Sequence, residues 1–105
     1  MRFLLKVSIP VEAGNEAAKN GRLAETIAEI LDELKPEAAY FLADDNGQRT
    51  GIFFFEMQEA SQIPAVAEPW FLAFNASVEF YPVMIPDDLK KATPHIKKAV
   101  KKYSK

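Results

Sequence analysis

Gly51-Ile52-Phe53-Phe54-Phe55-Glu56-Met57 is the stretch that decides the fold, because it is short and apolar at almost every position. A strand that is buried on one face alternates apolar and polar residues, whereas a strand that is buried on both faces is apolar throughout. We therefore expect this stretch to be the central strand of a small sheet that is covered on both sides. A chain of 105 residues can cover one face with its own helices. The other face then needs a ligand or a second copy of the protein.

The composition indicates a single globular domain. Hydrophobic residues make up 49% of the chain and charged residues 27%, which is typical of folded proteins and not of disordered ones. Cysteine is absent, which excludes disulfides and thiolate metal sites and fits a cytoplasmic protein. Lys6 interrupts the apolar start of the chain and no long apolar segment follows, so we expect neither a signal peptide nor a membrane span.

The net charge of −2 conceals a strong asymmetry. Residues 90–105 contain seven lysines and no acidic residue, whereas residues 1–89 contain all 15 acidic residues and 6 of the 13 basic ones. Such a basic segment is either an arm for nucleic acid or membranes, or a solvated helix face attracted to the chain's own acidic surface. It has no arginine and no interleaved aromatic residues, and the acidic remainder would repel phosphate. We favour the second interpretation and expect no nucleic-acid partner.

The first half of the chain predicts a strand, a helix and a hairpin. Residues 3–9 alternate apolar and polar side chains until Pro10, and Gly14-Asn15 indicates a loop. Apolar residues then recur at helical spacing from Leu23 to Leu34, and Pro36 ends this helix. A second strand over 38–44 leads through Asn46-Gly47, a strong hairpin signal, into the central strand from about residue 50.

The second half predicts another helix, an edge strand and a closing helix. The helix begins near Ser61, and Pro69 within it predicts a kink or a restart. A fourth strand over 76–84 contains Pro82, which cannot donate to a strand ladder and so marks an edge. Pro86-Asp87-Asp88 indicates a short helical turn.

Thr93-Pro94 then predicts the start of a separate closing helix, in which we expect the apolar side chains to pack against the body. These side chains are Ile96, Val100 and Tyr103. Residues 1–85 would form the domain, and residues 86–105 its lysine-rich helical extension.

The order strand-helix-strand-strand-helix-strand is that of an α+β ferredoxin-like fold. Right-handed crossovers place the first and third strands in the centre, which gives a four-stranded antiparallel sheet of order 4-1-3-2 with two helices on one face. The helix-covered face would hold Phe3, Leu5, Val7, Phe53, Phe55, Val78 and Phe80. The opposite face would hold Leu4, Lys6, Tyr40, Leu42, Ile52, Phe54, Glu56, Glu79 and Tyr81.

That opposite face is too apolar to face water, so we expect a sheet-to-sheet homodimer. Its apolar centre would be formed by Leu4, Leu42, Ile52 and Phe54. Each of these side chains contributes roughly 1.5–3 kcal/mol when it is buried.

Residues 1–85, through this order of elements, resemble the dimeric α+β barrel superfamily, which includes small antibiotic-biosynthesis monooxygenases, muconolactone isomerase-like proteins and haem-degrading monooxygenases. Three segments also resemble a family of small bacterial proteins that brings no established activity. They are Gly47-Gln48-Arg49-Thr50-Gly51, Ala67-Glu68-Pro69-Trp70-Phe71 and Ala76-Ser77-Val78-Glu79-Phe80. The resemblance implies a homodimeric barrel with a pocket between sheet and helices.

Enzymes of that superfamily place His, Asn, Trp or Tyr side chains in this pocket, but no catalytic residue of this chain matches their motifs. Our candidate ligand-binding residues are Trp70, Phe74, Tyr40, Tyr81 and Glu79. For Trp70 and Phe74 the alternative is ordinary core packing, and Asn75 is typical of a helix C-cap.

The glutamates of the opposite sheet face and the single histidine each allow a structural interpretation as well as a functional one. Glu56 and Glu79 share a sheet face and could perform acid–base work, or they could pair with Lys6 or be solvated, which we favour. His95, the only histidine, lies in the basic segment, and we interpret it as a surface residue and not as a haem or metal ligand. We expect no cofactor and no metal.

The sequence thus favours a homodimeric barrel that binds a small apolar or aromatic ligand without catalysis. The alternative is a cofactor-independent monooxygenase or isomerase acting on a small aromatic molecule. In either case we expect the ligand to border the helix that contains Pro69 and to stack on Trp70. The hydroxyl group of Tyr40 or Tyr81 would orient it.

Overall fold

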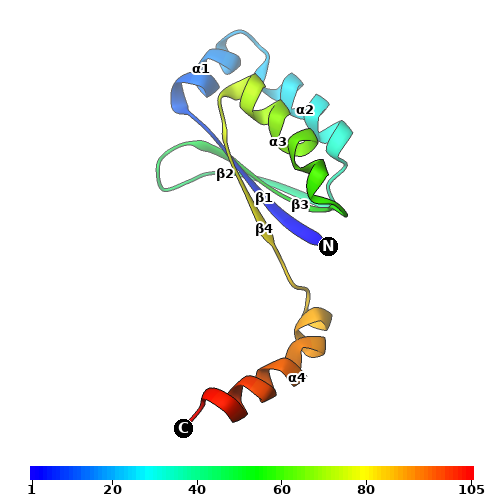
Figure 1. Cartoon of the computed structure of the whole chain (residues 1–105). Coiled ribbons are helices and arrows are strands. Elements are labelled where there is room, and N and C mark those ends of the chain that lie inside the picture. The colour runs from blue at the N-terminus through cyan, green and yellow to red at the C-terminus, as the bar shows by residue number, and fades with distance from the viewer.

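The computed structural model describes residues 1–105 as a four-stranded antiparallel sheet with three helices on one face and a fourth helix beyond its end (Figure 1). The elements in chain order are β1 (Arg2–Ile9), α1 (Val11–Lys19), α2 (Leu23–Leu34), β2 (Ala38–Ala43), β3 (Arg49–Glu56), the 3₁₀ turn η1 (Ala60–Gln62), α3 (Ile63–Phe74), β4 (Ser77–Pro82) and α4 (Pro86–Tyr103).

The sheet order β2-β3-β1-β4 confirms the predicted ferredoxin-like α+β fold. The two strands richest in apolar residues, β1 and β3, lie in the centre, where Leu4 is opposite Phe54 and Leu5 is opposite Phe53. The edge strand β4 contains Pro82, as expected of a residue without a backbone donor.

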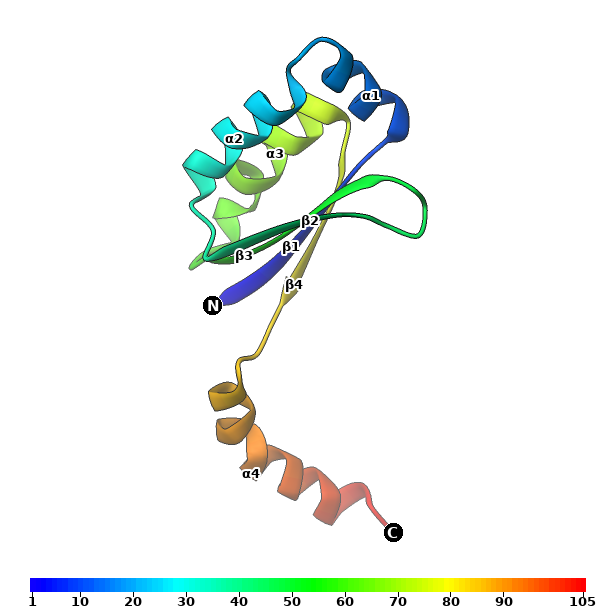
Figure 2. The ribbon, with the colours of Figure 1, turned by 180° about the vertical axis from the view of Figure 1, so that it is seen from behind.

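The core lies between the sheet and the layer of α1, α2 and α3 (Figure 2). Leu5, Val7, Phe53 and Trp70 are its most completely buried large side chains. Three of them come from the central strands and one from α3. The helix-covered face predicted from strand alternation is therefore the core face.

The first crossover contains two helices, whereas the sequence predicted one. Gly14-Asn15, expected in a loop, lies inside α1, which begins directly after Pro10. The reason is close packing: a Cβ atom on Gly14 would lie 2.7 Å from Nη1 of Arg49, so a glycine lets α1 approach β3.

Helix α3 continues through Pro69 from Ile63 to Phe74, so the expected restart does not occur. Packing of Trp70 and Phe74 into the core keeps the helix in place despite the missing donor. Asn75 ends α3 as its C-cap with a left-handed φ of 53°, which confirms that prediction.

The expectation for the C-terminal segment is wrong in two respects. Residues 86–103 form one helix that runs through Pro94, and α4 stands away from the body instead of packing on it (Figures 1 and 2). Ile96, Val100 and Tyr103 are between 50% and 74% exposed. The molecule measures 59 × 28 × 21 Å as a consequence. Neither α4 nor any other helix combines the length and apolarity that crossing a membrane requires.

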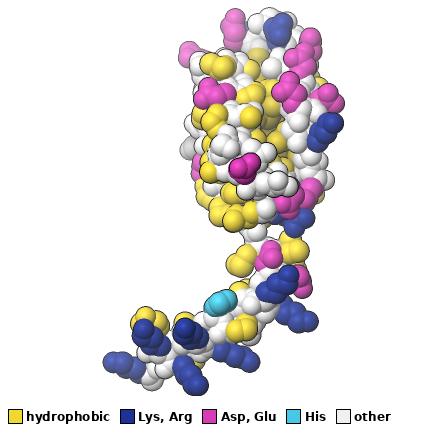
Figure 3. Space-filling model, turned by 45° about the vertical axis from the view of Figure 1, so that its right-hand side comes forward, with side chains coloured by type: hydrophobic (Ala, Val, Ile, Leu, Met, Phe, Trp, Pro, Cys, Tyr) yellow, Lys and Arg dark blue, Asp and Glu magenta, His cyan; other side chains and the backbone are white.

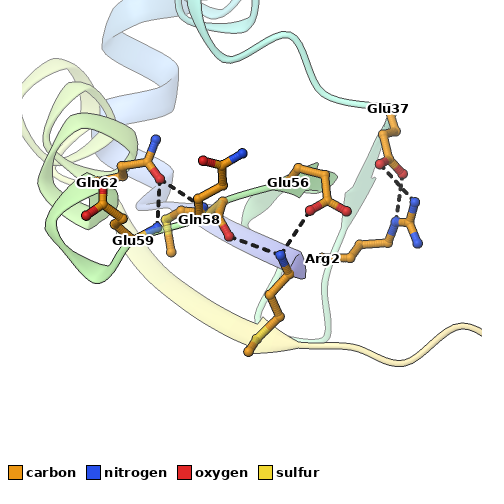
Figure 4. A network of polar contacts seen from close by, with 8 residues as sticks. Arg2, Glu37, Glu56, Gln58, Glu59 and Gln62 are labelled. Atoms are coloured by element: carbon orange, nitrogen blue, oxygen red, sulfur yellow. Dashed lines mark hydrogen bonds and ion pairs between the residues drawn. The ribbon is translucent and has the colours of Figure 1, made fainter. Parts of the chain in front are cut away.

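Polar contacts fix the end of the sheet from which α4 departs (Figure 4). The amino group of Met1 donates to Glu56 at 3.0 Å, so Glu56 pairs with the chain terminus and not with Lys6. Arg2 donates two hydrogen bonds to Glu37, at 2.9 and 3.0 Å. These bonds lower the pKa of Glu37 and raise the pKa of Arg2.

Candidate ligand-binding cavity

A cavity of about 640 Å³ lies between the sheet and helices α1 and α2, beside the β2–β3 hairpin. We call it the sheet–helix cavity. Ten of its 15 lining residues are hydrophobic, which is typical of sites for small organic molecules. The lining consists of Val7, Ile9, Val11, Asn15, Leu23, Ile27, Phe41, Leu42, Ala43, Gly47, Arg49, Thr50, Gly51, Phe53 and Trp70.

Three aromatic side chains form one wall of the cavity. The Phe53 ring stacks on Trp70 with centroids 5.3 Å apart, and Phe41 meets Phe53 edge-on at 5.7 Å. Gly51 makes room for this arrangement, since a Cβ atom there would lie 2.5 Å from Cζ of Phe53. The glycine in the central strand is therefore what allows the aromatic wall to form.

The indole N–H of Trp70 is buried and has no hydrogen-bond partner in the protein. Trp70 is only 1% exposed, yet it lines the cavity. More than nine in ten buried polar groups in native proteins are paired, because an unpaired one costs about 1–3 kcal/mol. Trp70 therefore lines the cavity and also carries a buried donor that has no partner in the protein.

Arg49 is the one charged residue of the lining. Its Nη1 donates to Oδ1 of Asn15 at 3.0 Å, and it takes part in none of the ion pairs of the structure. Asn15 therefore orients the guanidinium but leaves its charge without a carboxylate partner. The cavity can offer a positive charge and hydrogen-bond donors to a ligand.

The structure does not bring the five predicted site residues together. Trp70 lines the cavity, and Phe74 packs against Trp70 from within the core, with ring centroids 6.3 Å apart. Tyr40, Tyr81 and Glu79 lie on the opposite face of the sheet, because strand alternation turns them away from the helices. The tyrosine hydroxyl groups therefore cannot orient a ligand that touches Trp70 in the same chain.

Those three residues belong to what we call the open sheet face, the face without helices. It comprises Leu4, Lys6, Tyr40, Leu42, Ile52, Phe54, Glu56, Glu79 and Tyr81. No element of the chain covers it, and Tyr40 and Tyr81 are 60% and 46% exposed. The hydroxyl of Tyr81 donates to the carboxylate of Glu79, which raises the pKa of Tyr81.

Arg49, Asn15 and Phe41 line the cavity but are not among the site residues predicted from the sequence. A signal for Arg49 existed: counting back by twos from Phe53 through Gly51 places a charged side chain on the core face of β3. Such a residue needs a partner or a solvent opening. Asn15 gave no signal, because it was assigned to a loop.

No protein-family profile matches the chain, and no curated protein matches its sequence. Its fold does resemble solved structures. One is 5-chloro-2-hydroxyhydroquinone dehydrochlorinase (TftG) from Burkholderia phenoliruptrix AC1100 in complex with 2,5-dihydroxybenzoquinone, with a TM-score of 0.61 and 16% identity over 84% of this chain and 98% of that one.

A second is a formyltetrahydrofolate deformylase from Pseudomonas putida KT2440, with a TM-score of 0.50 and 17% identity over 79% of this chain. The alignment spans only 29% of the deformylase. At these identities the similarity concerns the backbone arrangement alone. Topology and comparisons together assign the chain a ferredoxin-like α+β fold, while its likeness to the small bacterial family stays a prediction.

Proposed function

We propose that this protein binds a small aromatic molecule in the sheet–helix cavity without transforming it. The observation that carries the proposal is that Trp70, whose buried N–H has no partner in the protein, lines an apolar cavity of about 640 Å³. A ligand with an acceptor oxygen would satisfy this donor and remove the cost of leaving it unpaired. Its ring would lie against the apolar walls.

The geometry also suggests how the ligand lies. Phe53 already stacks on one face of Trp70 and Phe74 packs against the same ring, which leaves less of the indole for the ligand stacking expected from the sequence. Arg49 favours a ligand with an acidic or quinone oxygen. TftG is bound to a molecule of this class, 2,5-dihydroxybenzoquinone, within a similar fold. This supports the ligand class we propose.

Binding without catalysis fits the lining better than the alternative of a cofactor-independent monooxygenase or isomerase. The cavity lining contains no carboxylate, histidine, lysine or tyrosine. Its one charged group, Arg49, offers only hydrogen-bond donors and is no general base. The alternative requires a proton acceptor from outside the lining, and steady turnover of a bound aromatic molecule would support it.

We further propose that the protein is a homodimer through its open sheet face, which would make it a dimeric α+β barrel. Leu42 is about half exposed in the single chain, and Tyr40 more so. An apolar sheet face of this kind marks an interaction surface. A second sheet packed against it would bury Leu4, Ile52 and Phe54 as well.

Fluorescence of the single tryptophan tests the ligand proposal. Titration with 2,5-dihydroxybenzoquinone and with hydroxybenzoates should change Trp70 emission saturably, after correction with free N-acetyltryptophanamide. By calorimetry, Trp70→Phe should weaken binding by about 2- to 12-fold, as expected for the loss of one hydrogen bond. Phe80→Leu is the control, since Phe80 packs on Phe3 and Phe55 and does not line the cavity, so this change should leave affinity unchanged. Absence of saturable binding across this panel would refute the proposal.

A further inference from the structure

Helix α4 carries an apolar stripe that nothing in its own chain covers. Leu89, Ile96, Val100 and Tyr103 recur at spacings of three, four and seven residues, with Ala92 and Ala99 between them. The four larger side chains are all at least half exposed. At 3.6 residues per turn they fall on one side of the helix, which is the pattern of a helix that packs on another surface.

The lysines occupy the other side of the same helix. Counting along a helical wheel places all six lysines of α4 in the half opposite Ile96, and Figure 3 shows basic side chains projecting from a helix that extends away from the body. This separation makes α4 an amphipathic helix, whose apolar side is typical of a buried surface and whose lysine side is typical of a solvent-exposed one.

The start of α4 is fixed in a direction that leads away from its own body. The N–H of Val83 donates to the carbonyl of Arg2 at 3.1 Å, which continues the pairing of β4 with β1 by one residue. The N–H of Ile85 then donates to the carboxylate of Asp88 at 3.1 Å, which caps the helix. With only three residues between β4 and α4, the stripe has no surface of its own chain within reach in this arrangement.

We infer that α4 docks on the body of a second copy of this chain. Residues 1–85 contain 13 acidic and 6 basic residues, a formal charge of −7, so the body attracts the lysine-rich helix. Two α4 helices packed against each other would instead bring the six lysines of one helix near the six of the other, and these like charges repel.

A membrane surface fits less well, because helices that lie in membranes present Trp, Phe and Leu. The stripe of α4 has no Trp or Phe, and two of its positions are alanine. Docking on a second copy does not depend on ligand binding, and it adds a reciprocal contact to the homodimer proposed above.

Two full-length variants test the inference. The stripe variant carries Ile96→Gln and Val100→Gln, which remove two apolar side chains of the stripe. The control variant carries Lys91→Gln and Lys98→Gln on the opposite half of the helix. Both variants introduce two glutamines, so their effects on helix propensity are matched. By sedimentation equilibrium, the stripe variant should raise the dimer dissociation constant about ten-fold or more, and the control should raise it less. Equal effects of the two variants, or none, would overturn the inference.

A second measurement locates the surface that α4 contacts, with the residues of the stripe left unchanged. The chain has no cysteine, so Ser104→Cys gives one site for a nitroxide label just beyond α4. Labelled protein is mixed with ¹⁵N-labelled wild type, and relaxation enhancement is read on the wild-type amides. Broadening within residues 1–85 supports docking on the body of the second copy. The inference would be overturned by broadening confined to residues 86–105 or by no broadening at all. It would also be overturned if phosphatidylglycerol vesicles recruited the protein without dimer formation.

Discussion

The indole ring of Trp70 lies nearly parallel to the ring of Phe53, with 5.3 Å between centroids and 17° between planes. Trp70 comes from α3 and Phe53 from the central strand β3, so this stack joins the two layers of the core. Phe74 also packs on the indole, with ring centroids 6.3 Å apart, and the indole N–H stays buried without a partner in the protein. The core contact thereby determines which chemistry the cavity can offer.

Gly51→Ala should break this arrangement. The added Cβ would lie 2.5 Å from the Phe53 ring, and the ring cannot move without disturbing Trp70. Overpacking of this kind costs about 1–3 kcal/mol of unfolding free energy, which urea denaturation would measure. Gly14→Ala is the comparison, because its Cβ would press mainly on the flexible Arg49 side chain while alanine favours the helix, so a smaller loss is expected. Equal destabilisation by both changes would contradict the role given to Gly51.

Arg49→Gln should weaken the binding of acidic aromatic ligands selectively. Arg49 has no carboxylate partner of its own and is partly open to solvent, so we expect a loss of about three- to ten-fold for 4-hydroxybenzoate. Binding of the neutral analogue 4-hydroxybenzamide should change little. Calorimetric titration of both ligands provides the check, and a parallel loss for the two would show that Arg49 acts through structure alone.

Phe54→Lys should disrupt the proposed dimer. Phe54 lies on the open sheet face opposite Leu4 of β1 and Ala38 of β2, so a charge there would have to be desolvated in a sheet-to-sheet contact. Light scattering should show monomer or aggregate for this variant and dimer for wild type. Ala28→Lys, at an exposed position of α2, should remain dimeric. If wild type is a monomer at micromolar concentration, the proposed dimer is refuted.

A hydrogen bond in the β2–β3 hairpin predicts that the stability of the fold depends on pH. The backbone N–H of Gln48 donates to the carboxylate of Asp44 at 3.0 Å, and this bond is the main cause that lowers the pKa of Asp44. Because the pKa in the folded state is below that in the unfolded state, Asp44 stabilises the fold at neutral pH. This contribution is lost as the pH falls through the lowered value.

Asp44→Ala should therefore reduce the melting temperature at neutral pH, and its difference from wild type should vanish in strong acid. Asp45→Ala serves as the control, because the Asp45 side chain accepts none of these hydrogen bonds. A difference between Asp44→Ala and wild type that stays constant with pH would contradict this account.

Strand alternation and turn residues were enough to predict the sheet. The apolar stretch around Phe54, the Asn46-Gly47 turn and the edge residue Pro82 act locally, so their consequences can be deduced from neighbouring residues. Sheet order and the division of the two faces followed from them and are confirmed.

The cavity and α4 depend on contacts between distant segments, and the sequence pattern could not supply these. Strand alternation puts Arg49 on the core face of β3, but its hydrogen bond to Asn15, 34 positions earlier, could not be deduced from the sequence. The position of Trp70 in the cavity could be predicted, but not that Phe53 would cover its face. The stripe of α4 predicted packing against the chain's own body, which is wrong, because the capped turn at Ile85 sends the helix away and leaves the stripe exposed.

The strand order also has a consequence for the time course of folding. Strand β1 lies at the centre of the sheet, but Leu4 pairs with Phe54 and Tyr81, so neither neighbour exists until about 50 more residues have been made. At roughly 5–20 residues per second, synthesis leaves this apolar strand without a partner for about 3–10 s. Pairing between strands that are distant in the sequence also slows refolding, because the entropy cost of closing the intervening loop precedes the stabilising strand contacts. The nascent chain is therefore most prone to aggregate before β3 emerges, and slower growth at low temperature with abundant chaperones should raise the yield of folded protein.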